Sequence, residues 1–99
     1  MKQPRLHPEI LTVLSNYSNR TELEDFLLDL LTPNEIVEIG NRWELIKLLV
    51  DGVPQRVIAK QLGISLGKIS RGARELKYGH DGFKKALQFI LTQSKTNPA

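Results

Sequence analysis

A short stretch near the middle of the chain has the residue types and spacing needed to contact the phosphates and base edges of DNA. Residues 55–71 read QRVIAKQLGISLGKISR. Two helices that cross through a turn of three or four residues need a small side chain at their contact, and Ala59 supplies it. Gly63 can adopt the left-handed conformation that ends the first helix. The spacing predicts a helix-turn-helix, whose second helix enters the major groove of DNA.

The two sides of this motif differ in polarity. Its inward surface is predicted to be apolar and to consist of Ile58, Leu62, Ile64 and Ile69. Ser65 stands where its hydroxyl can cap the second helix. The predicted DNA contacts are Gln55, Arg56 and Lys60 on phosphates, and Leu66, Gly67, Lys68 and Ser70 over base edges, with Ser65 and Arg71 beside them. The alternative is an ordinary helical hairpin, a common feature of small α proteins.

Charge is unevenly distributed along the chain, whose formal net charge is +3. Residues 21–41 contain no Lys or Arg, and their acidic side chains are Glu22, Glu24, Asp25, Asp29, Glu35 and Glu38. Residues 52–77 contain Glu75 alone against Arg56, Lys60, Lys68, Arg71, Arg74 and Lys77. A basic surface binds phosphates by releasing counterions. Simple solvation of a surface would explain these charges, but not why the basic half coincides with the helix-turn-helix.

The rest of the chain reads as helices that would position this motif, about six in all. The apolar spacing predicts helices from Pro8 to about Tyr17, from Thr21 to about Leu31 and from Pro33 to about Val50, and a last helix after Gly82. Thr21–Glu24 and Thr32–Glu35 both fit a capping box, in which a hydroxyl and a carboxylate satisfy the first free amides. We therefore predict an all-α fold.

The predicted helix from Pro33 to Val50 is apolar on more than one side. Its apolar residues are Ile36, Val37, Ile39, Trp43, Leu45, Ile46, Leu48, Leu49 and Val50. A surface helix needs a single apolar stripe, and a second copy of the chain is the simplest cover for the rest. We therefore predict an obligate homodimer of one domain, residues 1–99, with a helix-turn-helix at about 54–77 and a dimerisation core at about 8–50 and 81–93.

Composition excludes several classes of protein. The 99-residue chain has no cysteine, so it can form neither a disulfide nor a thiolate metal site. His7 and His80 are too few and too far apart for a metal cluster, and we expect no metal and no cofactor. No apolar run approaches the roughly 20 residues of a membrane span, and the start lacks the apolar stretch of a signal peptide. No nucleophile–base pair is visible. We expect a cytoplasmic protein that is not an enzyme.

Several motifs resemble the bacterial tryptophan operon repressor family: Thr32-Pro33-Asn34-Glu35, Gly40-Asn41-Arg42, Gln55-Arg56, Leu62-Gly63, Ile69-Ser70-Arg71-Gly72 and Leu76-Lys77. The resemblance covers roughly Leu27 to Lys77. It implies an intertwined all-helical dimer with two helix-turn-helix reading heads. It also implies that L-tryptophan binds between the core and the reading heads as a corepressor, and that only the liganded form holds the heads at operator spacing.

The resemblance assigns ligand roles to two arginines. Arg42 and Arg71 would hold the indole ring between their guanidinium planes, and one would also pair with the ligand carboxylate. Guanidinium groups stack on aromatic faces and pair with carboxylates through two hydrogen bonds, and lysine does neither as well. Taken separately, Arg42 could be an ordinary surface residue and Arg71 a phosphate contact.

The remaining ligand residues also come from the resemblance. Thr32 and the backbone carbonyls of Asp29 and Leu31 would lie near the ligand's amino group, although Thr32 is already explained as a helix cap. Gly72 would let the ligand ring lie against the helix. Glu75 departs from the family, which has a small hydroxyl residue near the ligand ammonium. A carboxylate can still meet an ammonium, but its unpaired charge is costly to bury.

The sequence therefore predicts a repressor that binds palindromic operator DNA as a dimer, responds to a small molecule, the amino acid L-tryptophan, and controls tryptophan biosynthesis genes. Two alternatives stay open. One is a DNA-binding regulator of the same fold with another effector or none. The other is a protein-interaction module, which would present a contiguous apolar patch on the second helix of the motif, where the sequence offers only Leu66.

Overall fold

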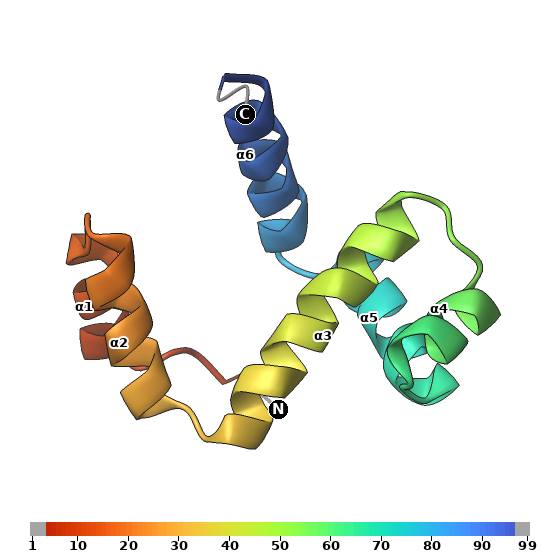
Figure 1. The fold of residues 1–99 in the computed structure, drawn as a ribbon, viewed down its shortest axis with the longest axis horizontal. Coiled ribbons are helices and arrows are strands. Elements are labelled where there is room, and N and C mark those ends of the chain that lie inside the picture. Colours follow the sequence, from red (N-terminus) through yellow and green to blue (C-terminus); the bar gives the residue numbers. More distant parts are fainter. Residues whose placement is uncertain (1–3, 97–99) are drawn as a thin grey trace. The chain divides into compact units, whose positions relative to one another are not determined.

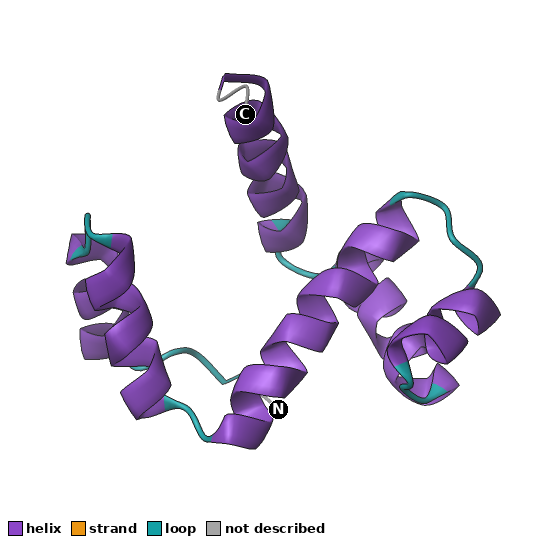
Figure 2. Cartoon of the chain, in the orientation of Figure 1, coloured by secondary structure: helices purple, strands orange, loops and turns teal. Residues whose placement is uncertain are grey.

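The computed structural model describes residues 4–96, which form six α-helices and no strand (Figures 1 and 2). The helices are α1 (Pro8–Asn16), α2 (Arg20–Leu30), α3 (Pro33–Val50), α4 (Gln55–Leu62), α5 (Leu66–Tyr78) and α6 (Gly82–Thr96). The all-helical prediction is confirmed. The chain forms two compact units, Met1–Val37 and Glu38–Ala99.

The first unit holds α1 and α2. The ring of Tyr17, at the end of α1, lies 6.0 Å from the ring of Phe26 on α2, measured between centroids. The predicted capping box at Thr21 is wrong. Helix α2 begins at Arg20, and the side chain of Asn19 accepts the hydrogen bond from the Glu22 amide at 3.0 Å. Asparagine caps helices better than threonine, so the helix begins one position before Thr21.

The second predicted capping box, at the start of α3, is confirmed. The Thr32 amide donates to Glu35 Oε1 at 2.8 Å, and the Glu35 amide donates to Thr32 Oγ1 at 3.2 Å. The two hydrogen bonds satisfy two of the amides that a helix start leaves free. The bond from the Thr32 amide, helped by the Thr32 hydroxyl, holds the pKa of Glu35 below its ordinary value of 4.5.

The second unit is built around the contact of α3 with α4 and α5, which cross beside its C-terminal half (Figure 1). Leu45 of α3, Ile58 of α4 and Ile69 of α5 form its buried cluster. Partly buried apolar side chains surround this cluster, namely Leu48, Leu49, Val53, Ala59, Leu62 and Ile64. The inward surface predicted for the helix-turn-helix is therefore confirmed.

The turn between α4 and α5 has the geometry that its residues predict. Gly63 ends α4 at φ 66°, in the left-handed region, where glycine avoids the steric penalty of a side chain. Ser65 caps α5, because its hydroxyl accepts a hydrogen bond from the Lys68 amide at 3.2 Å. These local interactions make the turn short, so α4 and α5 cross closely enough for Ile58 and Ile69 to be fully buried.

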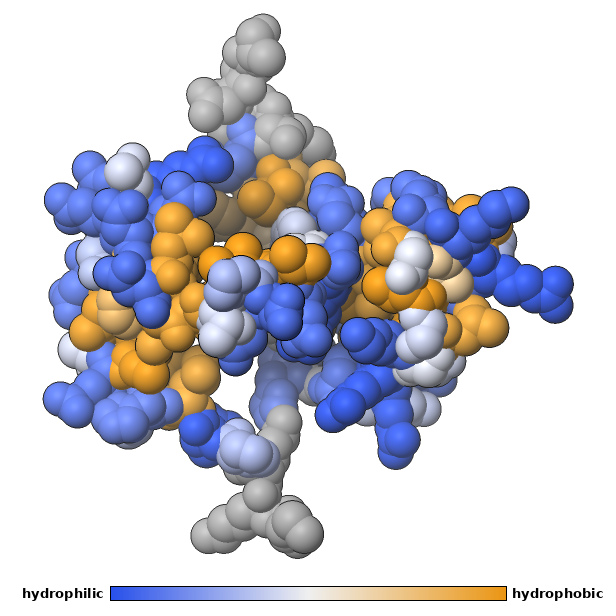
Figure 3. Space-filling view, turned by 60° about the horizontal axis from the view of Figure 1, so that its bottom comes forward, coloured by the Kyte–Doolittle hydropathy of each residue, from blue (hydrophilic) through white to orange (hydrophobic). Residues whose placement is uncertain are grey.

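Many large apolar side chains lie at the surface of the isolated chain. Neither α1 nor α2 contains a buried residue, and Figure 3 shows apolar side chains, in orange, at the surface of the protein. On α6, Phe89 is 63% exposed and Leu91 is 61% exposed. No helix in the described part of the chain is long and apolar enough to cross a membrane.

Candidate functional site

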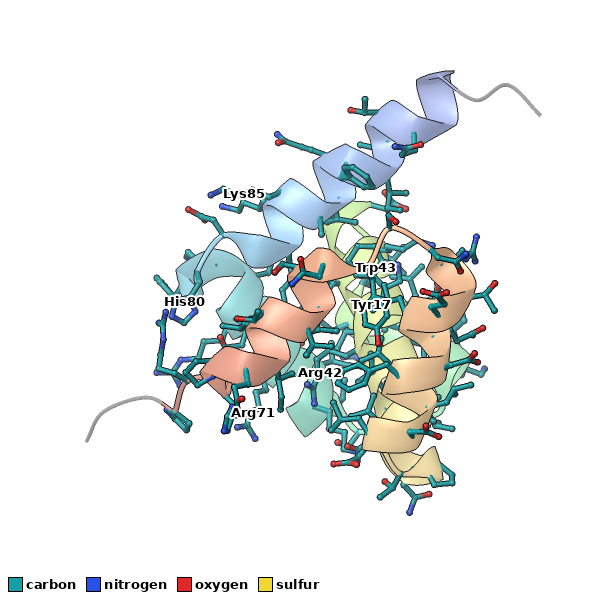
Figure 4. The ribbon with its side chains drawn as sticks, turned by 90° about the vertical axis from the view of Figure 1, so that its left-hand side faces the viewer. Tyr17, Arg42, Trp43, Arg71, His80 and Lys85 are labelled. Atoms are coloured by element: carbon teal, nitrogen blue, oxygen red, sulfur yellow. The ribbon has the colours of Figure 1, made fainter. Side chains whose placement is uncertain are left out.

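A cavity of about 570 Å³ lies in the second unit, between α3 and α5. Its lining comes from α3 (Glu38, Asn41, Arg42, Leu45), from the turn (Ile64), from α5 (Lys68, Arg71, Gly72, Glu75) and from the start of α6 (Phe83). Figure 4 labels Arg42 and Arg71, which reach this cavity from α3 and α5. Its volume is within the range of small-molecule sites, about 300–1,000 Å³.

The cavity is lined by charges of both signs. Arg42, Lys68 and Arg71 are the cations, and Glu38 and Glu75 are the carboxylates. None of the five takes part in an ion pair within the part of the chain that the structure describes. Their donors and acceptors are thus available to a ligand that carries both a carboxylate and an ammonium group.

Three of the residues assigned a ligand role by the family resemblance, Asp29, Leu31 and Thr32, are in the first unit. Thr32 caps α3 through the Glu35 amide, as described above. Leu31 ends α2, where its amide donates to the carbonyl of Leu27 at 2.9 Å. The other four, Arg42, Arg71, Gly72 and Glu75, all line the cavity.

Gly72 is buried where α5 packs against α3. A Cβ atom at this position would lie 2.7 Å from Cδ2 of Leu45 and 3.4 Å from its Cγ. A side chain at this position would therefore force Leu45 to move, whatever lies in the cavity. Gly67 differs, because a Cβ there would meet only the Ser65 hydroxyl, at 3.9 Å.

The residues predicted to contact DNA form an exposed surface of α4 and α5. The exposed members on α4 are Gln55, Arg56 and Lys60, and those on α5 are Leu66, Gly67, Lys68, Ser70 and Arg71. Exposed Arg74 and Lys77 continue the basic side of α5. The exposed large apolar side chains of α5, Leu66 and Tyr78, stand at opposite ends of the helix. The face between them is polar and basic, as binding to phosphates requires.

One hydrogen bond joins the two helices of this surface. The Ser70 hydroxyl on α5 donates to Oε1 of Gln55 on α4, with 3.3 Å between the oxygens. Sequence reasoning treated these two residues as separate DNA contacts, and their side chains in fact form a pair.

Six residues that line the cavity were not predicted as ligand contacts from the sequence: Glu38, Asn41, Leu45, Ile64, Lys68 and Phe83. A signal for the first two exists, because residues four apart share a helix face. Glu38 lies four positions before Arg42, and Asn41 lies four positions before Leu45. The same rule places Lys68 beside Gly72. Phe83 follows the turn after α5, so helix periodicity could not relate it to the other lining residues.

Comparison with known proteins identifies related regulators. A family described as Trp repressor protein matches residues 7–91. A Trp operon repressor homolog of Chlamydia trachomatis is 33% identical over 79% of this chain and 84% of its own length. One from Aliivibrio fischeri is 30% identical over 90% of this chain and 83% of its own. The uncharacterized protein YerC of Bacillus subtilis is 39% identical over 66% of this chain and 62% of its own. No solved structure gives a significant match.

Proposed function

Because this chain belongs to the Trp repressor protein family, we propose that it is a DNA-binding repressor that L-tryptophan activates and that controls genes of tryptophan biosynthesis. Membership makes it a Trp-repressor-like regulator of transcription and not an enzyme. Relatives that carry the name Trp operon repressor homolog support the choice of target genes.

The helix-turn-helix supports binding to the major groove. Its short turn, capped by Ser65, presents α5 with a polar, basic outward face. Arg56 and Lys60 on α4 would contact phosphates and set the register, while Leu66, Gly67 and other residues of α5 would lie over base edges.

The observation that carries the ligand proposal is that a single cavity is lined by Arg42 of α3 and by Arg71 of α5, the recognition helix. An indole ring between their guanidinium planes would be stabilised by stacking and cation–π attraction. The ligand carboxylate would pair with one arginine, and Glu75 would accept from the ligand ammonium. Leu31 and Thr32 are proposed near that ammonium from the family resemblance alone.

Ligand binding would act on DNA affinity through α5. Arg71 belongs both to the cavity and to the exposed surface of the helix. Gly67 and Gly72 weaken the helix by up to about 1 kcal/mol each relative to alanine. A ligand that contacts Arg71 would order this weakly held helix, and an ordered helix loses less conformational entropy when it binds DNA.

A homodimer is the form in which we propose that the protein acts, on a palindromic operator. The apolar side chains left exposed on α1, α2 and α6 support it, because a soluble chain seldom leaves so many uncovered. Two copies would place two recognition helices on successive major grooves.

Isothermal titration of the dialysed protein with L-tryptophan tests the effector, with L-phenylalanine and indole-3-propionate as controls. We expect saturable binding of one ligand per chain. Arg71→Lys should weaken it about tenfold or more, because lysine loses the paired hydrogen bonds and the stacking, while the melting temperature stays close to that of the unaltered protein.

Two results would change this assignment. Equal affinity in Arg71→Lys would exclude the stacking role of Arg71. The absence of any heat with L-tryptophan would exclude it as the effector and leave a regulator of this fold with another ligand or none. The polar outward face of α5 argues against the alternative of a protein-interaction module.

A further inference from the structure

Ser70 and Gln55 are held together across the helix-turn-helix. They are 15 positions apart in the sequence, and the Ser70 hydroxyl donates to Gln55 Oε1 at 3.3 Å. Both residues are exposed on the surface predicted to contact DNA. The hydrogen bond therefore joins a residue at the start of α4 to one in the first half of α5.

The chemistry of the two side chains determines which group accepts in this hydrogen bond and which group is left to donate. A glutamine carboxamide has one oxygen, which accepts, and one NH₂ group, which donates two hydrogens. With its oxygen held by Ser70, the Gln55 carboxamide has both hydrogens of its NH₂ group available for a partner outside the protein. That group can donate to a phosphate oxygen and has no lone pair that would repel it.

We propose that Ser70 is a positioning residue, whose hydroxyl holds the Gln55 carboxamide with its NH₂ group outward to donate to a DNA phosphate. This inference rests on the proposed DNA-binding function and changes the role of Ser70, which was expected to lie over base edges. In a helix-turn-helix the first helix crosses the sugar–phosphate backbone, and Gln55 is the first residue of that helix.

Positioning matters because glutamine is flexible. A free Gln side chain populates many rotamers and loses this freedom when it binds. Holding the carboxamide before DNA arrives reduces that loss, so the phosphate contact becomes more favourable. Removal of the Ser70 hydroxyl should then weaken DNA binding even if Ser70 itself touches no DNA.

The matched pair Ser70→Thr and Ser70→Val tests the proposal. Threonine and valine have nearly the same shape and the same β-branching, and only threonine keeps the hydroxyl. We would measure binding to a random-sequence duplex by fluorescence anisotropy at several salt concentrations. The Thr variant should bind like the unaltered protein, and the Val variant about three- to tenfold more weakly, as expected for the loss of one hydrogen bond.

Two further readouts separate positioning from a general structural effect. In a Gln55→Ala background the Thr and Val variants should bind equally, because the group that Ser70 positions is gone. In the free protein, the side-chain NH₂ signals of Gln55 in an NMR spectrum should show greater motion in Ser70→Val than in Ser70→Thr. If Ser70→Val fails to fold, Ser70→Ala compared with Ser70→Thr gives the same test.

Equal DNA affinity of the Thr and Val variants would overturn the proposal and leave the DNA-binding function intact. A difference that persists in the Gln55→Ala background would also overturn it, because Ser70 would then act on DNA directly. Failure of the unaltered protein to bind any duplex, both with and without L-tryptophan, would instead overturn the DNA-binding function, and with it the role of the Ser70 hydrogen bond in DNA binding.

Discussion

At the scale of single residues, two side chains of α5 lie both at the cavity and on the exposed surface of the helix. Lys68 was predicted to face bases, and it also lines the cavity together with Arg71. Both side chains are exposed, and their cationic ends lie on long flexible stems, so each can reach a ligand or a phosphate. The α4 cations Arg56 and Lys60 are not among the lining residues, so their substitution would test the proposed DNA contacts without altering the cavity.

Replacing Arg56 by alanine should therefore lower affinity for every duplex sequence. The slope of log affinity against log salt should become shallower by about one unit, because one fewer counterion is released. Anisotropy titrations at several salt concentrations measure this slope. Lys47→Ala is the matched control, since Lys47 lies on α3 and pairs with Glu44 at 3.4 Å. An unchanged slope in Arg56→Ala would remove Arg56 from the phosphate contacts.

Glu35 should make the start of α3 sensitive to acid. Its pKa lies below 4.5 because the Thr32 amide and hydroxyl favour the carboxylate. The stabilisation is fully present above pH 4.5 and is lost as the pH falls through the lowered pKa of the folded state. An NMR titration of the Glu35 carboxyl carbon should give a midpoint below that of the urea-unfolded chain. Equal midpoints would contradict the hydrogen bonds of the capping box.

At the scale of elements, the two glycines of α5 have different reasons to be there. Gly72 is buried against Leu45 of α3, so a larger residue there would have to displace the Leu45 side chain. Gly67 is exposed and meets no obstacle, so packing does not explain it. The proposed position of Gly67 over base edges would explain it, because a backbone without a side chain can approach DNA closely.

Alanine substitutions at these glycines should have opposite effects on stability. Gly72→Ala should destabilise the fold by about 1 kcal/mol, because overpacking against Leu45 outweighs the gain in helix propensity. Gly67→Ala should stabilise it by about 0.5–1 kcal/mol and weaken DNA binding. Urea denaturation measures the free energy of unfolding of both variants. A stabilised Gly72→Ala would mean that Leu45 rearranges freely.

At the scale of the whole molecule, the exposed apolar side chains favour self-association. Among the described side chains, the buried hydrophobic residues are Leu45, Ile46, Ile58 and Ile69. This is a small core for a chain of 99 residues, and domains of this size gain stability from oligomerisation when their own burial is limited. The two units of one chain would each have apolar surface to contribute to a dimer.

Analytical ultracentrifugation should find a homodimer that Phe89→Asp weakens by at least about tenfold, because burial of a charge in an apolar interface is costly. Phe89 is 63% exposed on α6, so this change removes little packing within a single chain. Gln88→Asp, at the neighbouring exposed position, adds the same charge and should leave the association unchanged. A monomeric unaltered protein would contradict the dimer.

The sequence by itself determined the helices, the helix-turn-helix and the caps at Thr32 and Ser65. These depend on interactions between residues a few positions apart, such as the bond from the Lys68 amide to the Ser65 hydroxyl. The misplaced cap of α2 shows the limit of such rules. Asn19 and Thr21 are both acceptable caps, and competition between them decides at which residue the helix begins.

Only the tertiary structure decided how residues far apart in the chain meet. The position of Leu45 beside Gly72, the entry of Phe83 into the cavity and the hydrogen bond from Ser70 to Gln55 all depend on how helices cross. A crossing angle results from the packing of whole side-chain surfaces. Helix periodicity specifies which side of each helix is buried, but it does not specify which residue of the next helix lies opposite.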